Sequence, residues 1–386
     1  MIFDSESVFE DNVITVLKQH GWKDGVLRYP TERDLLDNWK GILYRNNNDI
    51  DRLGKYPLTD GEMAQIIEQI ETLRTPLALN SFVNGRTVSI TRDNKEDVAH
   101  FGKEISLYIY DRKEIAGGKS TYQIAQQPVY PAKNKMLNSR RGDLVLLING
   151  MPLIHIELKK SGIPVSQATN QIEKYTHEGV FTGLFRLVQI FVAMNPDDAV
   201  YFANPGVDKF NPSYYFHWAD YNNEPICGGQ NPGKDEWKLF IGGTSGTAGL
   251  LSIPMAHQLI GFYTIADSAD GCLKVLRSYQ YIAANAISDV VRKCDWEQRP
   301  TTPGRPGGYV WHTTGSGKTM TSFKSAQLIA DSHDADKVVF LMDRIELGTQ
   351  SLRNTAVLLT VRRKYKVLRT PAFCGTNSTA PMSTTP

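Results

Sequence analysis

Asp143, Glu157 and Lys159 combine the side-chain types that metal-dependent cleavage of a phosphodiester bond requires. Residues 153–159 alternate in the manner of a strand, so His155, Glu157 and Lys159 share one face. Two neighbouring carboxylates can bind Mg²⁺, a cation that prefers oxygen ligands and retains several waters. The metal would lower the pKa of a bound water and offset charge on the phosphate, while the lysine positions the attacking water. We therefore expect Asp143 and Glu157 to bind Mg²⁺ beside Lys159.

Asp143 reaches this face in only one register of the hairpin that Asn149 and Gly150 predict. A loop centred on Gly150 places Asp143 opposite Glu157 on the same face. A two-residue Asn149–Gly150 loop shifts the pairing by one residue and turns Asp143 to the other face. Pro152 cannot donate a hydrogen bond within the ladder, which argues against the tightest turn. We expect the longer loop.

Polar residues on two predicted helices could complete the site. Gln171 and Tyr175 are four residues apart and lie on one helical face, from which they would contact DNA or tune the metal site. Glu6 and Glu10 have the same spacing near the N-terminus. Either could supply a third carboxylate to the site. Alternatively, the two glutamates form a solvated acidic face of the helix, which fits the spacing equally well. A basic cluster precedes Asp143 and would either bind DNA phosphates or form ordinary solvated surface. It consists of Lys133, Lys135, Arg140 and Arg141.

Residues 313–319, with the sequence TTGSGKT, have the composition of a loop that binds the phosphates of ATP. Backbone N–H groups and the N-terminus of the following helix would face the phosphates. Lys318 would reach the β and γ oxygens, and Thr319 would ligate Mg²⁺. His312 replaces the first glycine of the usual motif. The residues expected to contact the nucleotide are Thr314, Gly315, Ser316, Gly317, Lys318 and Thr319.

Arg277 and Gln280, at the start of a predicted helix upstream of this loop, resemble the adenine-reading glutamine motif of superfamily 2 helicases. Over roughly residues 1–350, the motifs in their order resemble those of the restriction (motor) subunit of type I restriction–modification enzymes. The motifs that carry the resemblance are Asp143, Glu157-x-Lys159, Gln171-x₃-Tyr175, Arg277-x₂-Gln280, GSGKT and MDRIEL.

This resemblance implies a PD-(D/E)xK nuclease that cuts double-stranded DNA with Mg²⁺, joined to RecA-like domains that translocate the duplex with ATP. Asp143 and Glu157 would be metal ligands and Lys159 the catalytic lysine, while Lys318 and Thr319 would bind ATP and its Mg²⁺. The subunits of this family work when docked on a methyltransferase built from modification and specificity subunits.

The apolar periodicities predict an α/β protein. The resemblance assigns residues 1–195 to the nuclease domain, a mixed sheet flanked by helices, and residues 256–350 to a partial RecA-like domain with a parallel sheet. Residues 196–255, rich in Asn, Pro, Gly and aromatics, would be a connector packed on the nuclease domain. The elements expected are helices at 5–21, 60–73, 166–175, 278–291 and 319–330, and strands at 86–90, 105–109, 187–193, 309–312 and 338–342.

Composition narrows the functional classes. The net charge of +2 does not by itself indicate nucleic-acid binding, so a DNA-binding surface must be local. The four cysteines are scattered without metal-binding spacing, which indicates a reduced, cytoplasmic protein. The most apolar stretch, residues 183–194, contains Arg186 and is too short to span a bilayer, so we expect no membrane role.

The region from Leu347 to Pro386 contains no Asp or Glu, although these residues make up 41 of the 386 in the chain. Its basic, Ser/Thr/Pro-rich part, residues 351–386, suggests a frameshifted and truncated gene product, with a native basic tail as the alternative. We expect a nuclease whose ATP-driven motor is incomplete. The alternative function is a catalytically silent module that binds DNA or the methyltransferase subunits.

Overall fold

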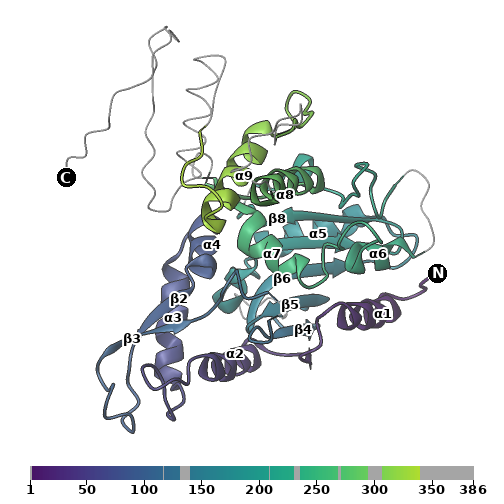
Figure 1. Cartoon of the computed structure of the whole chain (residues 1–386). Helices are drawn as coiled ribbons and strands as arrows, with labels where there is room; N and C mark the ends of the chain where they lie inside the picture. Colours follow the sequence, from purple (N-terminus) through teal and green to yellow (C-terminus); the bar gives the residue numbers. More distant parts are fainter. Residues whose placement is uncertain are drawn as a thin grey trace, which may run out of the picture.

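A six-stranded mixed sheet forms the centre of the protein, with strand order β1-β4-β5-β6-β7-β8 (Figure 1). The computed structural model describes residues 2–115, 117–130, 140–207, 209–229, 235–267, 271–293 and 307–339. β1 and β4 are parallel, as are β6 and β7, and the other neighbours are antiparallel. The α/β architecture with a mixed sheet is therefore confirmed. The strands are β1 (Val26–Arg28), β4 (Tyr122–Gln126), β5 (Leu144–Ile148), β6 (Met151–Leu158), β7 (Ile190–Met194) and β8 (Ala199–Ala203).

Helices α1 (Glu6–Gln19) and α5 (Val165–His177) flank the sheet. The Ser5 side chain caps α1 by accepting a hydrogen bond from the Val8 N–H, and an apolar stripe that includes Phe9 and Val13 is buried. α5 packs on β6 and β7 and, with the 3₁₀ turn Gly183–Leu187, forms the crossover between these two parallel strands. Both helices were expected from their periodicity, and both are present.

A second group of elements lies to the left of the sheet and below it in Figure 1. The buried Arg92 guanidinium links helix α3 to the β2–β3 hairpin, because it lies 2.6 Å from the Glu62 carboxylate and 2.9 Å from that of Asp97. A buried charge requires such pairing. The elements are α2 (Glu32–Asn46), α3 (Asp60–Thr72), α4 (Pro76–Asn84) and the antiparallel hairpin of β2 (Thr87–Thr91) and β3 (Glu104–Tyr108).

The region expected to be a connector contributes to the same hydrophobic core as the sheet. Trp218 and Trp237 are fully buried in this core, as their size predicts. Tyr214, another aromatic residue of this region, is 53% exposed and lies in a short 3₁₀ turn (Pro212–Tyr214) at the surface. Helix α6 (Glu236–Gly242) packs against α1.

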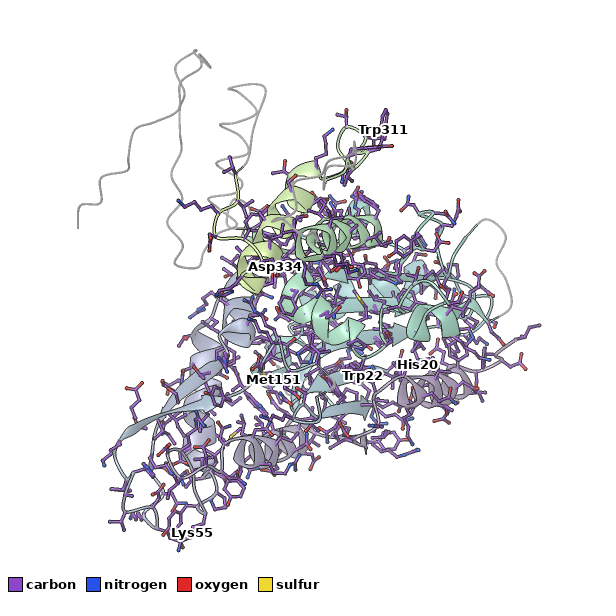
Figure 2. The ribbon with its side chains drawn as sticks, viewed as in Figure 1. His20, Trp22, Lys55, Met151, Trp311 and Asp334 are labelled. Atoms are coloured by element: carbon purple, nitrogen blue, oxygen red, sulfur yellow. The ribbon has the colours of Figure 1, made fainter. Side chains whose placement is uncertain are left out.

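After residue 254 the structure departs from the expected parallel sheet. Helices α8 (Ser278–Lys293) and α9 (Lys318–Ser332) match the two predicted helices, but the predicted strand at 309–312 is irregular backbone. Tyr309 and Trp311 are 89% and 88% exposed, and Figure 2 shows Trp311 at the periphery of the molecule. Among the residues that the structure describes, no strand pairs with this segment. The elements are α7 (Met255–Gln258), the π-helical turn Leu259–Tyr263, β9 (Thr264–Asp267), β10 (Cys272–Val275), α8 (Ser278–Lys293) and α9 (Lys318–Ser332).

In the described part of residues 256–339, the paired strands are β9 and β10, and they are antiparallel. Val338 and Val339 are irregular, while the rest of the strand expected at 338–342, the MDRIEL motif and the tail at 351–386 lie outside the described residues. No helix in the ranges described has the length and apolar character needed to cross a bilayer.

Helix α9 is attached to the earlier part of the chain by polar contacts. The Arg112 guanidinium lies 3.0 Å from the Asp331 carboxylate. Lys324 is buried, and its ammonium donates hydrogen bonds to Gln327 Oε1 at 2.7 Å and to the Thr264 carbonyl at 3.5 Å. Burial lowers the pKa of Lys324 to about 7.

Candidate active site

The β5–β6 hairpin brings Asp143 and Glu157 together by a route that the sequence did not predict. Asn149 and Gly150 form a two-residue turn with φ of 52° and 83°, and Ile148 pairs with Met151. The longer loop that we expected is therefore wrong. The pairing begins in the register that would have turned Asp143 away from Glu157.

A register shift next to Pro152 corrects this pairing. Leu147 pairs with Pro152, whereas Leu146 pairs with Ile154, so one extra residue is accommodated in β6. Proline is tolerated at such bulges because no ladder hydrogen bond is required of it there. Beyond the shift Leu144 pairs with Ile156, which brings Asp143 beside the residues that follow Ile156. The hairpin therefore combines the two-residue Asn149–Gly150 turn with a bulge beside Pro152, so both sequence features affect its pairing.

Asp143 is held by a hydrogen bond of 2.7 Å that its Oδ2 accepts from the Leu158 backbone N–H. Burial, followed by the negative charge of Glu157, raises the pKa of Asp143 well above its usual range. The Leu158 N–H and the Lys159 charge act in the opposite direction. The two carboxyl groups are thus close enough to affect each other's ionisation, as a shared metal site requires.

Glu157 is fully buried, and neither of its carboxylate oxygens has a hydrogen-bond partner in the described structure. Its Oε1 lies 3.5 Å from Lys159 Nζ, and its Oε2 lies 3.3 Å from His155 Nε2. Burial raises the pKa of Glu157 to about 7, although the Lys159 charge opposes this shift. A buried carboxylate without hydrogen bonds is energetically costly unless another group compensates its charge.

The donor set fits a magnesium ion. Within the ranges described, no group of three or more His, Cys, Asp or Glu side chains is arranged to hold a metal. Mg²⁺, however, is commonly bound by one or two carboxylates together with waters and substrate phosphates. The unpartnered oxygens of Glu157 and the adjacent Asp143 carboxylate supply that number of ligands.

Lys159 lies against both the hairpin and helix α1. Its ammonium donates a hydrogen bond to the Leu158 carbonyl at 2.8 Å and lies 3.7 Å from Glu6 Oε1. Glu6 is therefore the N-terminal acid nearest the lysine, and its side chain is 46% exposed.

Glu10 is the buried member of the N-terminal acid pair. Gln126 Nε2 donates a hydrogen bond to its Oε1 at 2.6 Å, and Gln127 Nε2 donates to its Oε2 at 3.1 Å. Burial raises the pKa of Glu10, and its charge contributes to the raised pKa of Asp143. The two glutamines were not identified from the sequence. The two consecutive glutamines at the end of β4 were the available signal.

Gln171 and Tyr175 contact each other as their spacing predicts. Gln171 Nε2 donates to the Tyr175 hydroxyl at 2.7 Å, and this hydroxyl donates to the Arg141 carbonyl at 2.9 Å. Tyr175 is buried, and burial raises its pKa to about 12. The pair therefore holds the segment that leads to Asp143. Of the basic cluster, Arg140 forms a bidentate pair with Glu178 at 2.8 and 2.9 Å, while Lys133 and Lys135 lie outside the described residues.

His155 and Tyr130 form a buried pair beside Glu157, and no pattern in the sequence predicted this contact. The Tyr130 hydroxyl lies 2.9 Å from His155 Nδ1. Burial lowers the pKa of His155 to about 4, so its imidazole is neutral at physiological pH. Its Nε2, which has no hydrogen-bond partner in the described structure, faces Glu157.

The glycine-rich loop precedes α9, with positive φ at Gly315 and Gly317. Gln280 is buried, and its Nε2 donates to the carbonyls of Ser316 at 3.2 Å and Gly317 at 3.4 Å. Its Oε1 accepts a hydrogen bond from the Arg277 N–H at 3.0 Å. The Gln280 carboxamide, which we expected to recognise adenine, is thus hydrogen-bonded to the glycine-rich loop and to the backbone at the N-terminus of α8.

The residues of the glycine-rich loop are more exposed to solvent than Gln280. Thr314 and Lys318 are exposed and Thr319 is partly exposed. The Ser316 hydroxyl contacts His312 Nδ1 at 2.8 Å, so His312, which replaces the usual glycine, closes the loop on itself. A pocket of about 240 Å³ lies beside the loop, and Phe216, Arg277 and Gly317 are among the residues that line it.

Comparison with known proteins agrees with this arrangement of motifs. The family model described as type I restriction enzyme R protein N terminus matches residues 4–210. A second model, described as SWI2/SNF2 ATPase, matches residues 279–369. That match continues past Gln350, where we expected the resemblance to end.

Individual relatives carry the same description. The type I restriction enzyme SsaAORF53P endonuclease subunit of Staphylococcus saprophyticus is 31% identical over 359 residues, which cover 91% of this chain and 33% of that protein. The SauCOLORF180P endonuclease subunit of Staphylococcus aureus is 32% identical over 353 residues, with the same coverage. The EcoprrI endonuclease subunit of Escherichia coli is 29% identical over 217 residues, 55% of this chain and 62% of that protein.

The chain spans about a third of the length of the staphylococcal relatives. The first family model matches residues 4–210, which is more than half of the 386 residues. The chain belongs to the type I restriction enzyme R protein N-terminus family.

Proposed function

We propose that this chain hydrolyses phosphodiester bonds of double-stranded DNA in a Mg²⁺-dependent reaction at the Asp143–Glu157–Lys159 site. The observation that carries this proposal is the environment of Glu157. Its two buried carboxylate oxygens lack hydrogen-bond partners in the described structure. Oε1 lies 3.5 Å from the Lys159 ammonium, Oε2 lies 3.3 Å from His155 Nε2, and the Glu157 charge raises the pKa of the Asp143 carboxyl. Such an arrangement costs folding free energy and is accounted for by a cation ligand.

Asp143 and Glu157 would hold Mg²⁺, which when bound lowers the pKa of a water ligand and offsets charge on the scissile phosphate. Asp143 is oriented for this role by the Leu158 N–H. Lys159, 3.5 Å from Glu157, would orient the attacking water and contact the phosphate. Glu10, held by two glutamines, would supply a further carboxylate through a water molecule, because it is buried next to Asp143.

Gln171 and Tyr175 would position Asp143 indirectly, through the backbone of the segment that precedes it. Their hydrogen-bonded pair fixes the Arg141 carbonyl, two residues before Asp143, and so limits the movement of that carboxylate. Precise placement of catalytic groups depends on such supporting contacts.

The glycine-rich loop would bind ATP and its Mg²⁺. Backbone N–H groups of Thr314, Gly315, Ser316 and Gly317 would contact the phosphates, with Lys318 on the terminal oxygens and Thr319 on the metal. Gln280 would keep the loop in its binding conformation through the Ser316 and Gly317 carbonyls.

The relatives are named as endonuclease subunits, so we place this activity in a cytoplasmic complex with modification and specificity subunits, in which ATP-driven translocation of DNA is coupled to cleavage. The specificity subunit would select the DNA sequence.

Plasmid nicking tests the nuclease proposal. The purified chain is incubated with supercoiled DNA and Mg²⁺, with and without ATP and a cognate methyltransferase, beside Asp143→Ala. We expect nicking that needs Mg²⁺ and is lost in the variant. Equal nicking by the variant would place the activity elsewhere. DNA or methyltransferase binding without nicking under every condition would favour the alternative, a catalytically silent module.

A further inference from the structure

Tyr29 and Arg141 form an exposed aromatic–guanidinium pair at the edge of the central sheet. The Arg141 guanidinium carbon lies 5.9 Å from the centre of the Tyr29 ring. Tyr29 is 51% exposed, and Arg141 is exposed as well. Among the described residues Arg141 forms no ion pair, in contrast to its neighbour Arg140, which is bound by Glu178. The Arg141 charge is therefore available to a ligand.

The backbone of Tyr29 is in an unfavourable conformation for a tyrosine. Its φ is 55°, in the left-handed region that bulky side chains rarely adopt and that glycine or asparagine adopts readily. Because the ring is half exposed, its burial contributes little free energy to offset this backbone strain. Neither backbone preference nor core packing accounts for a tyrosine at this position, and strained residues of this kind concentrate at functional sites.

Both members of the pair are attached to the residues of the candidate active site. The Tyr29 N–H donates to the Gln126 carbonyl at 2.8 Å, and the Gln126 side chain binds Glu10. Arg141 lies two residues before Asp143, and its carbonyl accepts the hydrogen bond from Tyr175. The pair is thus fixed relative to the carboxylates by the same contacts that position them.

We propose that Tyr29 and Arg141 clamp a DNA strand beside the cleavage site, with Arg141 on a backbone phosphate and the Tyr29 ring against an adjacent base or sugar. This inference rests on the proposed DNA substrate. An arginine supported by an aromatic ring retains its donors for a phosphate, while the free ring face can stack on a base. The clamp would hold the strand that the candidate metal site cuts.

DNA affinity is measured by fluorescence anisotropy with a labelled duplex in EDTA, so that binding is separated from hydrolysis. Tyr29→Gly is expected to weaken binding about tenfold, the effect of losing one stacked base. Tyr29→Phe retains the ring and is expected to bind like the wild type. Because glycine relieves the positive φ, Tyr29→Gly should keep the melting temperature of the wild type or exceed it. A loss of affinity therefore cannot be attributed to unfolding.

The dependence of affinity on salt separates the two roles. Arg141→Ala is expected to reduce the slope of log affinity against log salt by about one, because one phosphate contact is lost. Tyr29→Gly should leave this slope unchanged. Arg140→Ala is the matched control, since it removes the same charge from a guanidinium already held by Glu178 and should also leave the slope unchanged.

Wild-type affinity and salt slope in both Tyr29→Gly and Arg141→Ala would overturn the clamp, while the proposed nuclease would stand if Asp143→Ala still abolished nicking. A slope reduced equally by Arg140→Ala and Arg141→Ala would also overturn it, because general surface charge would then explain binding. A wild-type chain without measurable DNA affinity would overturn the DNA substrate and the clamp together.

Discussion

The Asp143 carboxylate accepts a 2.7 Å hydrogen bond from the backbone N–H of Leu158, the residue that follows Glu157. This bond ties the beginning of β5 to the end of β6 at the point where the two carboxylates meet. It forms because the register shift beside Pro152 moves the pairing by one residue before the strands reach Asp143. The geometry of the site therefore depends on a turn and a bulge at the opposite end of the hairpin.

Replacing Glu157 with glutamine should separate catalysis from stability. We expect nicking to fall by more than about a hundredfold, because removing a metal ligand exceeds the usual cost of losing a supporting contact. Metal-free stability should be retained or should rise, because the variant removes a buried carboxylate whose oxygens have no hydrogen-bond partners in the described structure. Urea unfolding in EDTA measures the stability. A large loss of stability would show that Glu157 supports the metal-free fold.

The turn at Gly150 should be sensitive to a methyl group. A Cβ at Gly150 would lie 2.9 Å from both Cα and Cδ1 of Trp39, and the residue has a positive φ. We expect Gly150→Ala to lower the free energy of unfolding by about 1–3 kcal/mol and to reduce nicking as the hairpin shifts. Gly102→Ala is the control, because Gly102 has a similar φ but open space around its Cβ. Equal destabilisation in both variants would leave backbone strain as the whole explanation.

Gln280 offers a test of how the glycine-rich loop is organised. Because its carboxamide binds the Ser316 and Gly317 carbonyls, Gln280→Ala should weaken ATP and GTP binding equally, by roughly tenfold for the loss of the two hydrogen bonds to the loop. Titration calorimetry with each nucleotide measures this effect. A loss confined to ATP would instead identify Gln280 as an adenine-reading residue.

Lys324 should make stability depend on pH. Its pKa falls from 10.5 in the unfolded chain to about 7 in the fold, so between these values the unfolded chain binds more protons and stability rises with pH. The slope contributed by one such group is at most about 1.4 kcal/mol per pH unit. Lys324→Met should remove this contribution, and unfolding at several pH values between 7 and 10 measures the difference. Parallel curves for variant and wild type would contradict the shifted pKa.

Local patterns were sufficient for several helices and for the parts of the site that lie close in the chain. The apolar stripe that includes Phe9 and Val13 predicts α1, and the i, i+4 spacing of Gln171 and Tyr175 predicts their contact. The same kind of pattern failed at Tyr309 and Trp311. An apolar run becomes a strand when a neighbouring strand completes its hydrogen bonds, and within the described ranges residues 309–312 are paired with none.

By itself, the sequence determined the composition of the site. It supplied two carboxylates and a lysine on a hairpin, a glycine-rich loop before a helix, and the family to which these motifs belong. The tertiary structure alone decided which atoms meet. The bulge beside Pro152 set the register, β4 brought Gln126 and Gln127 to Glu10, and the fold placed Tyr29 against Arg141. The physical reason is that spacing along a chain fixes the face of one element, whereas contacts between elements depend on packing and on ladder hydrogen bonds shared with distant segments.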